Sequence, residues 1–277
     1  MSAFEVAAGG VTLRGDDGGE GPAILMLHGL SATRRYVVHG STALERDGYR
    51  VISYDSRGHG ESSPAPTPDD YRYDQLADDA MRVLDDRGVD KTALVGMSMG
   101  AAVAAAVALG HPDRVQALVA VTPAHLGTPT ADPARWDGLA QGLQDGGPDG
   151  FVQAYGDPGV DARSLELIRT VMRQRLSRHE HPEAVADALR CTPRGAAFDG
   201  VGALAGITCP TLVVGSQDRL DPEHPLRTAE RWAAALPGAQ FMVEDDAESP
   251  LAWRGGSLSR VIAGFLAGAG MTPRATR

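Results

Sequence analysis

Residues 92–109 read TALVGMSMGAAVAAAVAL, a short apolar run that passes into an Ala-rich helical pattern through Gly96-Met97-Ser98-Met99-Gly100. A sharp strand-to-helix turn needs small residues on both sides of the serine, because larger side chains collide across the bend. Such a turn projects the Ser98 hydroxyl and leaves the next backbone N–H at a helix N-terminus, where negative charge is favoured. The stretch therefore predicts a nucleophilic serine. A glycine-rich turn with an incidental serine is the structural alternative.

Short apolar runs alternate with helical patterns on both sides of this turn. We predict parallel strands at Ile24–Leu27, Val51–Tyr54, Ala93–Val95, Ala117–Val121, Thr211–Val214 and Gln240–Val243. Two further runs, Phe4–Ala7 and Val11–Arg14, flank Gly9-Gly10 and predict an edge hairpin. Helical spacing is expected over 76–87, 99–109 and 258–266. The alternation is typical of an α/β protein whose parallel sheet has helices on both faces.

One long segment, Leu126 to Phe198, shows no strand pattern. It has helical stretches interrupted by Gly/Pro clusters at Gly127–Pro133, Gly146–Pro148 and Gly156–Gly159. We predict a mainly helical insertion between the fourth and fifth parallel strands, which acts as a lid over the pocket mouth. The predicted core domain is then residues 1–125 and 199–277, and the lid is residues 126–198.

Composition excludes several classes of protein. The 277 residues include 26 Lys and Arg against 36 Asp and Glu, a net charge of −10 that argues against nucleic acid or an anionic membrane as the main partner. Two cysteines, Cys191 and Cys209, are too few for a disulfide framework. No signal peptide or membrane span is evident, which predicts a cytoplasmic protein. We expect a small-molecule substrate and neither a metal nor an organic cofactor, and leave a homodimer open.

Further motifs extend the pattern along nearly the whole chain: LMLHGL at 25–30, YDSRGHGES at 54–62, HPDRV at 111–115 and CPTLVVG at 209–215. Together with the serine turn they resemble the α/β-hydrolase superfamily. The resemblance implies an eight-stranded, mostly parallel sheet with helices on both faces and a helical lid. It also implies Ser98 as nucleophile, Asp218 as the acid, and the N–H groups of Leu30 and Met99 as the oxyanion hole. Epoxide hydrolases and haloalkane dehalogenases of the superfamily carry a carboxylate at this turn, so the serine disfavours both.

The resemblance also calls for a histidine after the last strand, where this chain reads DDAESPL at 245–251. Glu248 takes that place, and the last histidine of the chain is His224. Beside Asp218, Glu248 would share a site in which one carboxyl has a raised pKa, and such a group can serve as a general base. The alternatives are that Glu248 faces solvent or is an inactivating change. The acidic run Glu244-Asp245-Asp246 is interpreted as a solvated loop.

The eight histidines of the chain are the candidates to replace the missing one. His28 and His59 belong to loop motifs, where a supporting role is expected, and His28 is also a possible pocket residue. His125 follows a predicted strand and is a candidate pocket residue. The rest are expected at the surface, in the insertion or at helix ends: His39, His111, His179, His181 and His224.

Three functions remain open from the sequence. The first is a serine hydrolase of a small, largely apolar ester, thioester or lactone with an atypical triad of Ser98, Asp218 and Glu248. The second is a lyase, cyclase or isomerase of the same fold that uses Glu248 as acid and base, and the third is a ligand-binding protein without catalysis. The insertion supplies apolar candidates for the pocket, although packing of the helices explains them equally well: Trp136, Leu143, Phe151, Tyr155 and Met172.

Overall fold

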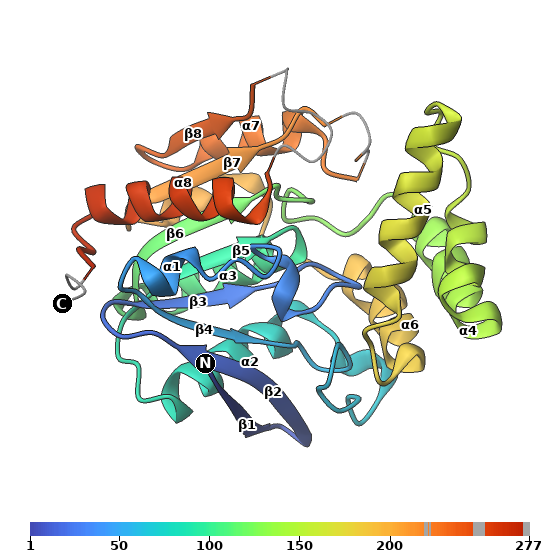
Figure 1. Ribbon diagram of the computed structural model, residues 1–277, viewed down its shortest axis with the longest axis horizontal. Helices are drawn as coiled ribbons and strands as arrows, with labels where there is room; N and C mark the ends of the chain where they lie inside the picture. Colours follow the sequence, from blue (N-terminus) through green and yellow to red (C-terminus); the bar gives the residue numbers. More distant parts are fainter. Residues whose placement is uncertain (219–220, 222, 246–252, 274–277) are drawn as a thin grey trace.

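The fold is a single twisted sheet of eight strands with helices on both faces (Figure 1). The computed structural model describes residues 1–218, 221, 223–245 and 253–273. The strand order is β1-β2-β4-β3-β5-β6-β7-β8. Strands β3 to β8 pair in parallel, whereas β1 and β2 form an antiparallel hairpin whose second strand pairs antiparallel with β4. The predicted α/β fold class is confirmed.

All eight predicted strands are present. Their bounds are β1 Ser2–Ala8, β2 Val11–Gly18, β3 Ala23–Leu27, β4 Arg50–Tyr54, β5 Thr92–Met97, β6 Val115–Val121, β7 Thr211–Gly215 and β8 Gln240–Val243. Every residue of β3 and β7 is buried. Strands covered by helices on both faces have no solvated side, which explains why these runs are continuously apolar.

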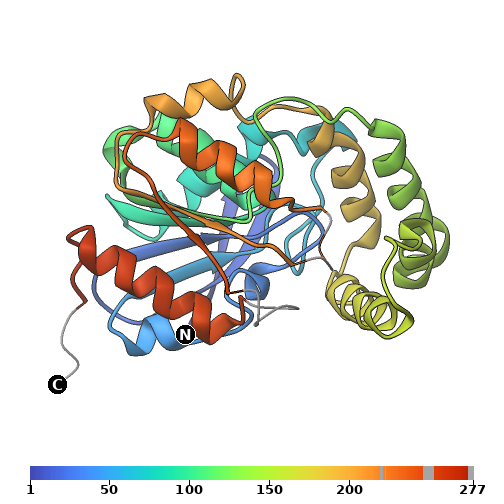
Figure 2. The ribbon, with the colours of Figure 1, turned by 90° about the horizontal axis from the view of Figure 1, so that it is seen from above.

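The helices divide between the two faces of the sheet. Apolar side chains of α2 (Tyr73–Asp86), α3 (Met99–Gly110) and α7 (Leu226–Ala235) pack on one face, and those of α1 (Ala43–Arg46) and α8 (Gly255–Gly268) pack on the other. Figure 2 shows α7 and α8 on opposite sides of the strands. Short 3-10 helices lie at Arg34–Tyr36, Pro68–Asp70, Pro112–Arg114, Thr192–Arg194 and Val201–Gly206. No helix in the described ranges combines the length and apolarity needed to cross a bilayer.

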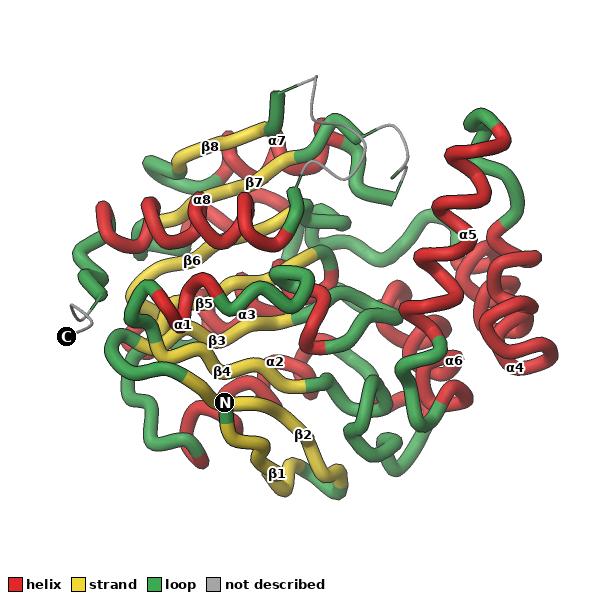
Figure 3. Tube along the Cα trace, viewed as in Figure 1, coloured by secondary structure: helices red, strands yellow, loops and turns green. Residues whose placement is uncertain are grey.

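The segment between β6 and β7 is helical, as Figure 3 shows. It contains α4 (Pro133–Tyr155), α5 (Ala162–Leu176) and α6 (Pro182–Cys191). The cluster at 146–148 interrupts the helix as predicted: α4 consists of two helical pieces that meet at a kink, where Gly147 has a non-helical φ of 59° and ψ of −146° before Pro148. The three helices share a small apolar core of their own and lie beyond the carboxyl ends of the strands (Figure 1). That they close as a lid stays a prediction.

Candidate active site

The serine turn has the conformation that its sequence predicts. Ser98 joins β5 to α3 with φ 55° and ψ −114°, a left-handed conformation that few non-glycine residues adopt. A Cβ on Gly96 would collide with the carbonyl of Gly100, and a Cβ on Gly100 would collide with the carbonyl of Leu27. The predicted backbone strain is confirmed, and so is the need for glycine on both sides. The turn presents the Ser98 side chain to a cavity at the carboxyl edge of the sheet.

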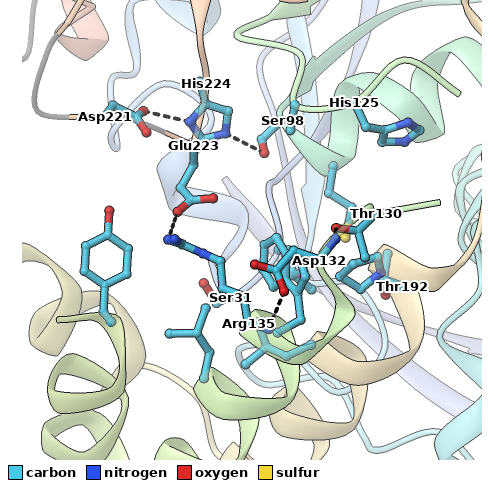
Figure 4. A pocket seen from close by; sticks show the side chains of 18 of the residues that line it. Ser31, Ser98, His125, Thr130, Asp132, Arg135, Thr192, Asp221, Glu223 and His224 are labelled. Atoms are coloured by element: carbon cyan, nitrogen blue, oxygen red, sulfur yellow. Dashed lines mark hydrogen bonds and ion pairs between the residues drawn. The ribbon is translucent and has the colours of Figure 1, made fainter. Parts of the chain in front are cut away.

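The Ser98 hydroxyl is hydrogen-bonded to a histidine. Its Oγ lies 2.7 Å from Nε2 of His224, and Nδ1 of the same ring lies 2.7 Å from a carboxylate oxygen of Asp221 (Figure 4). When Nδ1 carries the proton, the ring donates to Asp221 and accepts from Ser98. Desolvation raises the pKa of Asp221, but the charge and hydrogen bond of His224 outweigh it, and the pKa lies below its usual value. The arrangement is that of a nucleophile, a base and a group that orients the base.

A buried glutamate anchors the segment that carries this histidine. Glu244, next after β8, accepts hydrogen bonds from the Ser216 hydroxyl (2.5 Å) and the Gln217 N–H (2.9 Å). The Gln217 amide donates in return to the carbonyl of Glu244 at 2.9 Å. The expectation of a solvated acidic loop is therefore wrong for Glu244, which is 5% exposed. These bonds fix the chain as it leaves β7 toward Asp221 and His224.

The structure assigns the histidine's carboxylate partner differently from the sequence. Asp218 lines the cavity and donates its N–H to the Ser216 hydroxyl at 3.2 Å, but the carboxylate on Nδ1 of His224 is that of Asp221. Sequence reasoning placed His224 at the start of the next helix. It lies just before α7, in a turn that directs its ring to the Ser98 hydroxyl. The available signal was the Asp-x-x-His spacing of Asp221 and His224 between β7 and α7. Glu248 lies outside the described residues, so its predicted contacts stay a prediction.

The two residues predicted to form an oxyanion hole line the same cavity as Ser98: Leu30 and Met99. Met99 is the first residue of α3, so its N–H has no acceptor within the helix. The loop before Leu30 passes close to the nucleophile, because a Cβ on Gly29 would lie 3.2 Å from the Ser98 Cβ. Both N–H groups thus belong to the backbone that borders the serine.

Three buried histidines support the loop that contains Leu30. His28 bonds the carbonyl of Gly29 at 2.8 Å, His59 accepts from the N–H of Ser31 at 3.2 Å, and His179 bonds the carbonyl of Ser31 at 3.1 Å. Burial lowers the pKa of His28 to about 4 and the pKa values of His59 and His179 to about 3. All three rings are therefore neutral near pH 7.

Two expectations for these histidines are corrected. His28 was a possible pocket residue, but it is 1% exposed behind the loop and does not line the cavity. His179 was expected in solvent, yet it is buried and also accepts the Gly60 N–H at 2.8 Å. It follows α5, so it joins the helical insertion to the loops of the core domain.

His125 lines the cavity as predicted. Its Nδ1 accepts the Gly127 N–H at 2.9 Å, and its ring stacks on Phe198 with centroids 5.7 Å apart. Burial lowers its pKa to about 4. No hydrogen bond joins it to Ser98, so its place is in the wall of the cavity.

The cavity has a volume of about 640 Å³ and lies between the sheet edge and the helical insertion. Trp136, Phe151 and Tyr155 of α4 line it as predicted, together with Met172 of α5, whereas Leu143 packs within the insertion. Charged side chains also line it, including Arg175 and Arg135, and Arg135 pairs with Glu223 (Figure 4). Within the described ranges, no group of three or more His, Cys, Asp or Glu side chains is placed to hold a metal ion.

Comparison with known proteins agrees with the fold. Residues 22–179 match the model of the alpha/beta hydrolase fold family, and the chain belongs to this family. It is 30% identical over 227 residues to the putative carbamate hydrolase RutD of Klebsiella pneumoniae, covering 79% of this chain and 81% of that protein. It is 34% identical over 165 residues to epoxide hydrolase 1 of Siraitia grosvenorii, covering 60% of this chain and 51% of that protein. The chain thus spans about half the length of that relative.

Among solved structures, a thermophilic esterase from Thermogutta terrifontis superimposes with a TM-score of 0.76 at 26% identity. The match covers 97% of this chain and 99% of the esterase. The family of this chain therefore includes related hydrolases of several kinds.

Proposed function

We propose that the chain is a serine hydrolase of small, largely apolar esters, in which Ser98 is the nucleophile, His224 the general base and Asp221 the group that orients the base. The observation that carries the proposal is the pair of 2.7 Å contacts that link Ser98 to His224 and His224 to Asp221. Thioesters and lactones undergo the same acyl transfer and belong to the same proposal.

The geometry supports a two-step reaction. The Ser98 oxygen attacks the carbonyl carbon while Nε2 of His224 takes its proton, and the carbonyl electrons move onto oxygen. The N–H groups of Leu30 and Met99 donate to this oxyanion. The electron pair then returns, the bond to the leaving alcohol breaks, and His224 gives the alcohol its proton. Water attacks the acyl-enzyme in the same way and releases the acid and the free serine.

The position of His224 favours hydrolysis over the lyase, cyclase or isomerase interpretation. That alternative was motivated by a glutamate in the usual place of the base. A histidine within hydrogen-bond distance of the nucleophile supplies a base with an ordinary proton path. The esterase and the putative carbamate hydrolase among the similar proteins are named for related acyl chemistry. We further propose that residues 126–198 act as a lid, because α4, α5 and α6 all contribute side chains to the cavity wall.

A serine-directed fluorophosphonate probe tests the assignment of the base. We expect Ser98 to be labelled in the unsubstituted protein and no labelling in Ser98→Ala. His224→Gln should slow both labelling and p-nitrophenyl acetate hydrolysis at least about a thousandfold, because the serine loses its proton acceptor. Glu248→Gln should leave both rates nearly unchanged, as should the exposed control His111→Gln. If Glu248→Gln abolishes both rates and His224→Gln preserves them, the base is Glu248 and our assignment is wrong.

A further inference from the structure

An arginine in the cavity wall has no hydrogen-bond acceptor among the described residues. Arg175 of α5 lines the cavity, and its Nε is covered by protein without a partner. Within the described ranges no hydrogen bond or ion pair joins the rest of its guanidinium to another side chain. Two other arginines have carboxylate partners: the buried Arg57 pairs with Asp79, and Arg135 of this cavity pairs with Glu223. Unmet donors of a charged group are costly unless a ligand or water accepts from them.

The carboxylates nearest to Arg175 are already engaged. Asp221 accepts from His224, and Glu223 accepts from Arg135. Both act on Arg175 through their charge, although neither pairs with it. Burial lowers the pKa of Arg175, and the charge of Asp221 opposes that effect. A guanidinium nevertheless stays protonated near neutral pH. The cavity thus contains a cation whose charge is partly balanced, but whose N–H groups have no acceptor in the part of the chain that the structure describes.

The surroundings of Arg175 define a mixed subsite. Ile168, Val171, Met172 and Arg175 recur at helical spacing on α5 and all line the cavity, so three apolar side chains lead to one cation. Tyr155 lines the same cavity and interacts with the charge of Arg175. Burial raises the pKa of Tyr155 to about 12, so its phenol stays protonated and is a second donor.

We propose, building on the serine hydrolase function above, that the substrate carries a carboxylate on the part that faces α5, and that Arg175 binds it with a further hydrogen bond from Tyr155. The planar guanidinium matches the two oxygens of a carboxylate in a bidentate pair. A dianionic phosphate is disfavoured, because one cation would have to hold it beside Asp221 and Glu223. The chemical class is therefore an ester with an apolar acyl chain that ends in a carboxylate.

The test compares two matched substrates, the p-nitrophenyl monoester of suberic acid and the same ester with its free carboxyl converted to a primary amide. We expect the unsubstituted protein to favour the acid over the amide in kcat/KM by about tenfold or more, as for hydrogen bonds to charged groups. Arg175→Met should abolish this preference, chiefly through a higher KM for the acid. Arg175→Lys keeps the charge but not the planar fork, so it should retain part of the preference.

A matched control lies on the same helix. Arg169 of α5 also has a covered, unpartnered Nε, but it does not line the cavity. Arg169→Met should therefore keep the full preference for the acid. An equal rate on acid and amide in the unsubstituted protein, or a preference that survives Arg175→Met, would overturn the proposal.

Binding measured in Ser98→Ala separates this proposal from the hydrolase function. In that background the acid should bind at least about tenfold more tightly than the amide, and Arg175→Met should remove the difference. Equal binding of the two would overturn carboxylate recognition even if Ser98 reacts normally with the fluorophosphonate probe. Tight, Arg175-dependent binding of the acid without any labelling of Ser98 would support the subsite and refute the hydrolase function.

Discussion

Acidification should destabilise the protein through the three buried histidines, His28, His59 and His179, that support the loop containing Leu30. Burial lowers the pKa of His28 to about 4 and those of His59 and His179 to about 3, against 6.5 in the unfolded chain. Between these values the unfolded chain binds more protons than the folded one. The free energy of unfolding therefore falls as the pH falls below about 6.5, and the full contribution is present above it.

The magnitude follows from the width of that interval. From pH 6.5 to pH 5 each ring stays neutral in the fold and titrates in the unfolded chain, which costs about 1.4 kcal/mol per pH unit. Each histidine thus removes about 2 kcal/mol by pH 5, and the three together remove about 6 kcal/mol. The free energy of unfolding of a whole domain is only about 5–15 kcal/mol. A loss of this size should therefore be evident when urea unfolding curves at pH 7.5 and pH 5 are compared.

Other groups also make stability depend on pH. Burial raises the pKa values of Asp55 and Asp79, which increases the free energy of unfolding as the pH falls. Comparing a single-histidine variant with the unsubstituted protein isolates the contribution of one ring. His59→Gln keeps a donor and an acceptor but does not titrate. The loss of stability between pH 7.5 and pH 5 should be about 2 kcal/mol smaller in this variant. His111→Gln, at an exposed site, should behave as the unsubstituted protein does. The same pH dependence in His59→Gln and in the unsubstituted protein would refute the argument.

Three further outcomes are expected. Asp221→Asn should lower kcat for p-nitrophenyl acetate by about a thousandfold or more, because His224 loses the carboxylate that holds its tautomer, and a loss under tenfold would exclude that role. Gly100→Ala should cost about 1–3 kcal/mol in urea unfolding and suppress fluorophosphonate labelling, since the added Cβ collides with a carbonyl of β3; normal labelling would contradict this. Asp79→Asn should cost about 3–5 kcal/mol by leaving the buried Arg57 without its counter-charge, and unchanged thermal unfolding would show that the pair is dispensable.

The strands could be predicted from sequence because each is an apolar run with clear ends. The predicted bounds of β8 are those of the structure, and most other ends are short by one or two residues, because a hydrogen-bonded ladder continues past the last apolar side chain. The largest difference is in β2, which continues four residues beyond the predicted end at Arg14. Thr92 begins β5 although it is polar, because its hydroxyl donates to the carbonyl of Ala23 at 3.0 Å and can therefore be buried. The Gly/Pro cluster at 146–148 predicts a break that is present at Gly147, but the close approach of Gly142 to Gly150 across it depends on how the two helical pieces pack.

The site could be predicted only in part, because side-chain direction in loops depends on distant contacts. The position of Ser98 could be predicted because the glycines on both sides of it are required by the local geometry of the turn. The position of His224 beside Ser98 was missed because its segment is held by hydrogen bonds to Glu244, which follows a different strand, β8. The burial of His179 depends likewise on Ser31, 148 positions earlier in the chain. No local pattern contains either contact.

The geometry separates the proposed chemistry from the proposed recognition. Asp221 and His224 lie three residues apart between β7 and α7, so their mutual hydrogen bond is local and only the contact to Ser98 must be set by the fold. That contact joins the turn between β5 and α3 to the segment just before α7. Arg175 and Tyr155 come instead from the helical insertion. Substitutions in α4 and α5 can therefore change which ester is accepted, while Ser98, His224 and the proposed oxyanion donors keep their positions in the core domain.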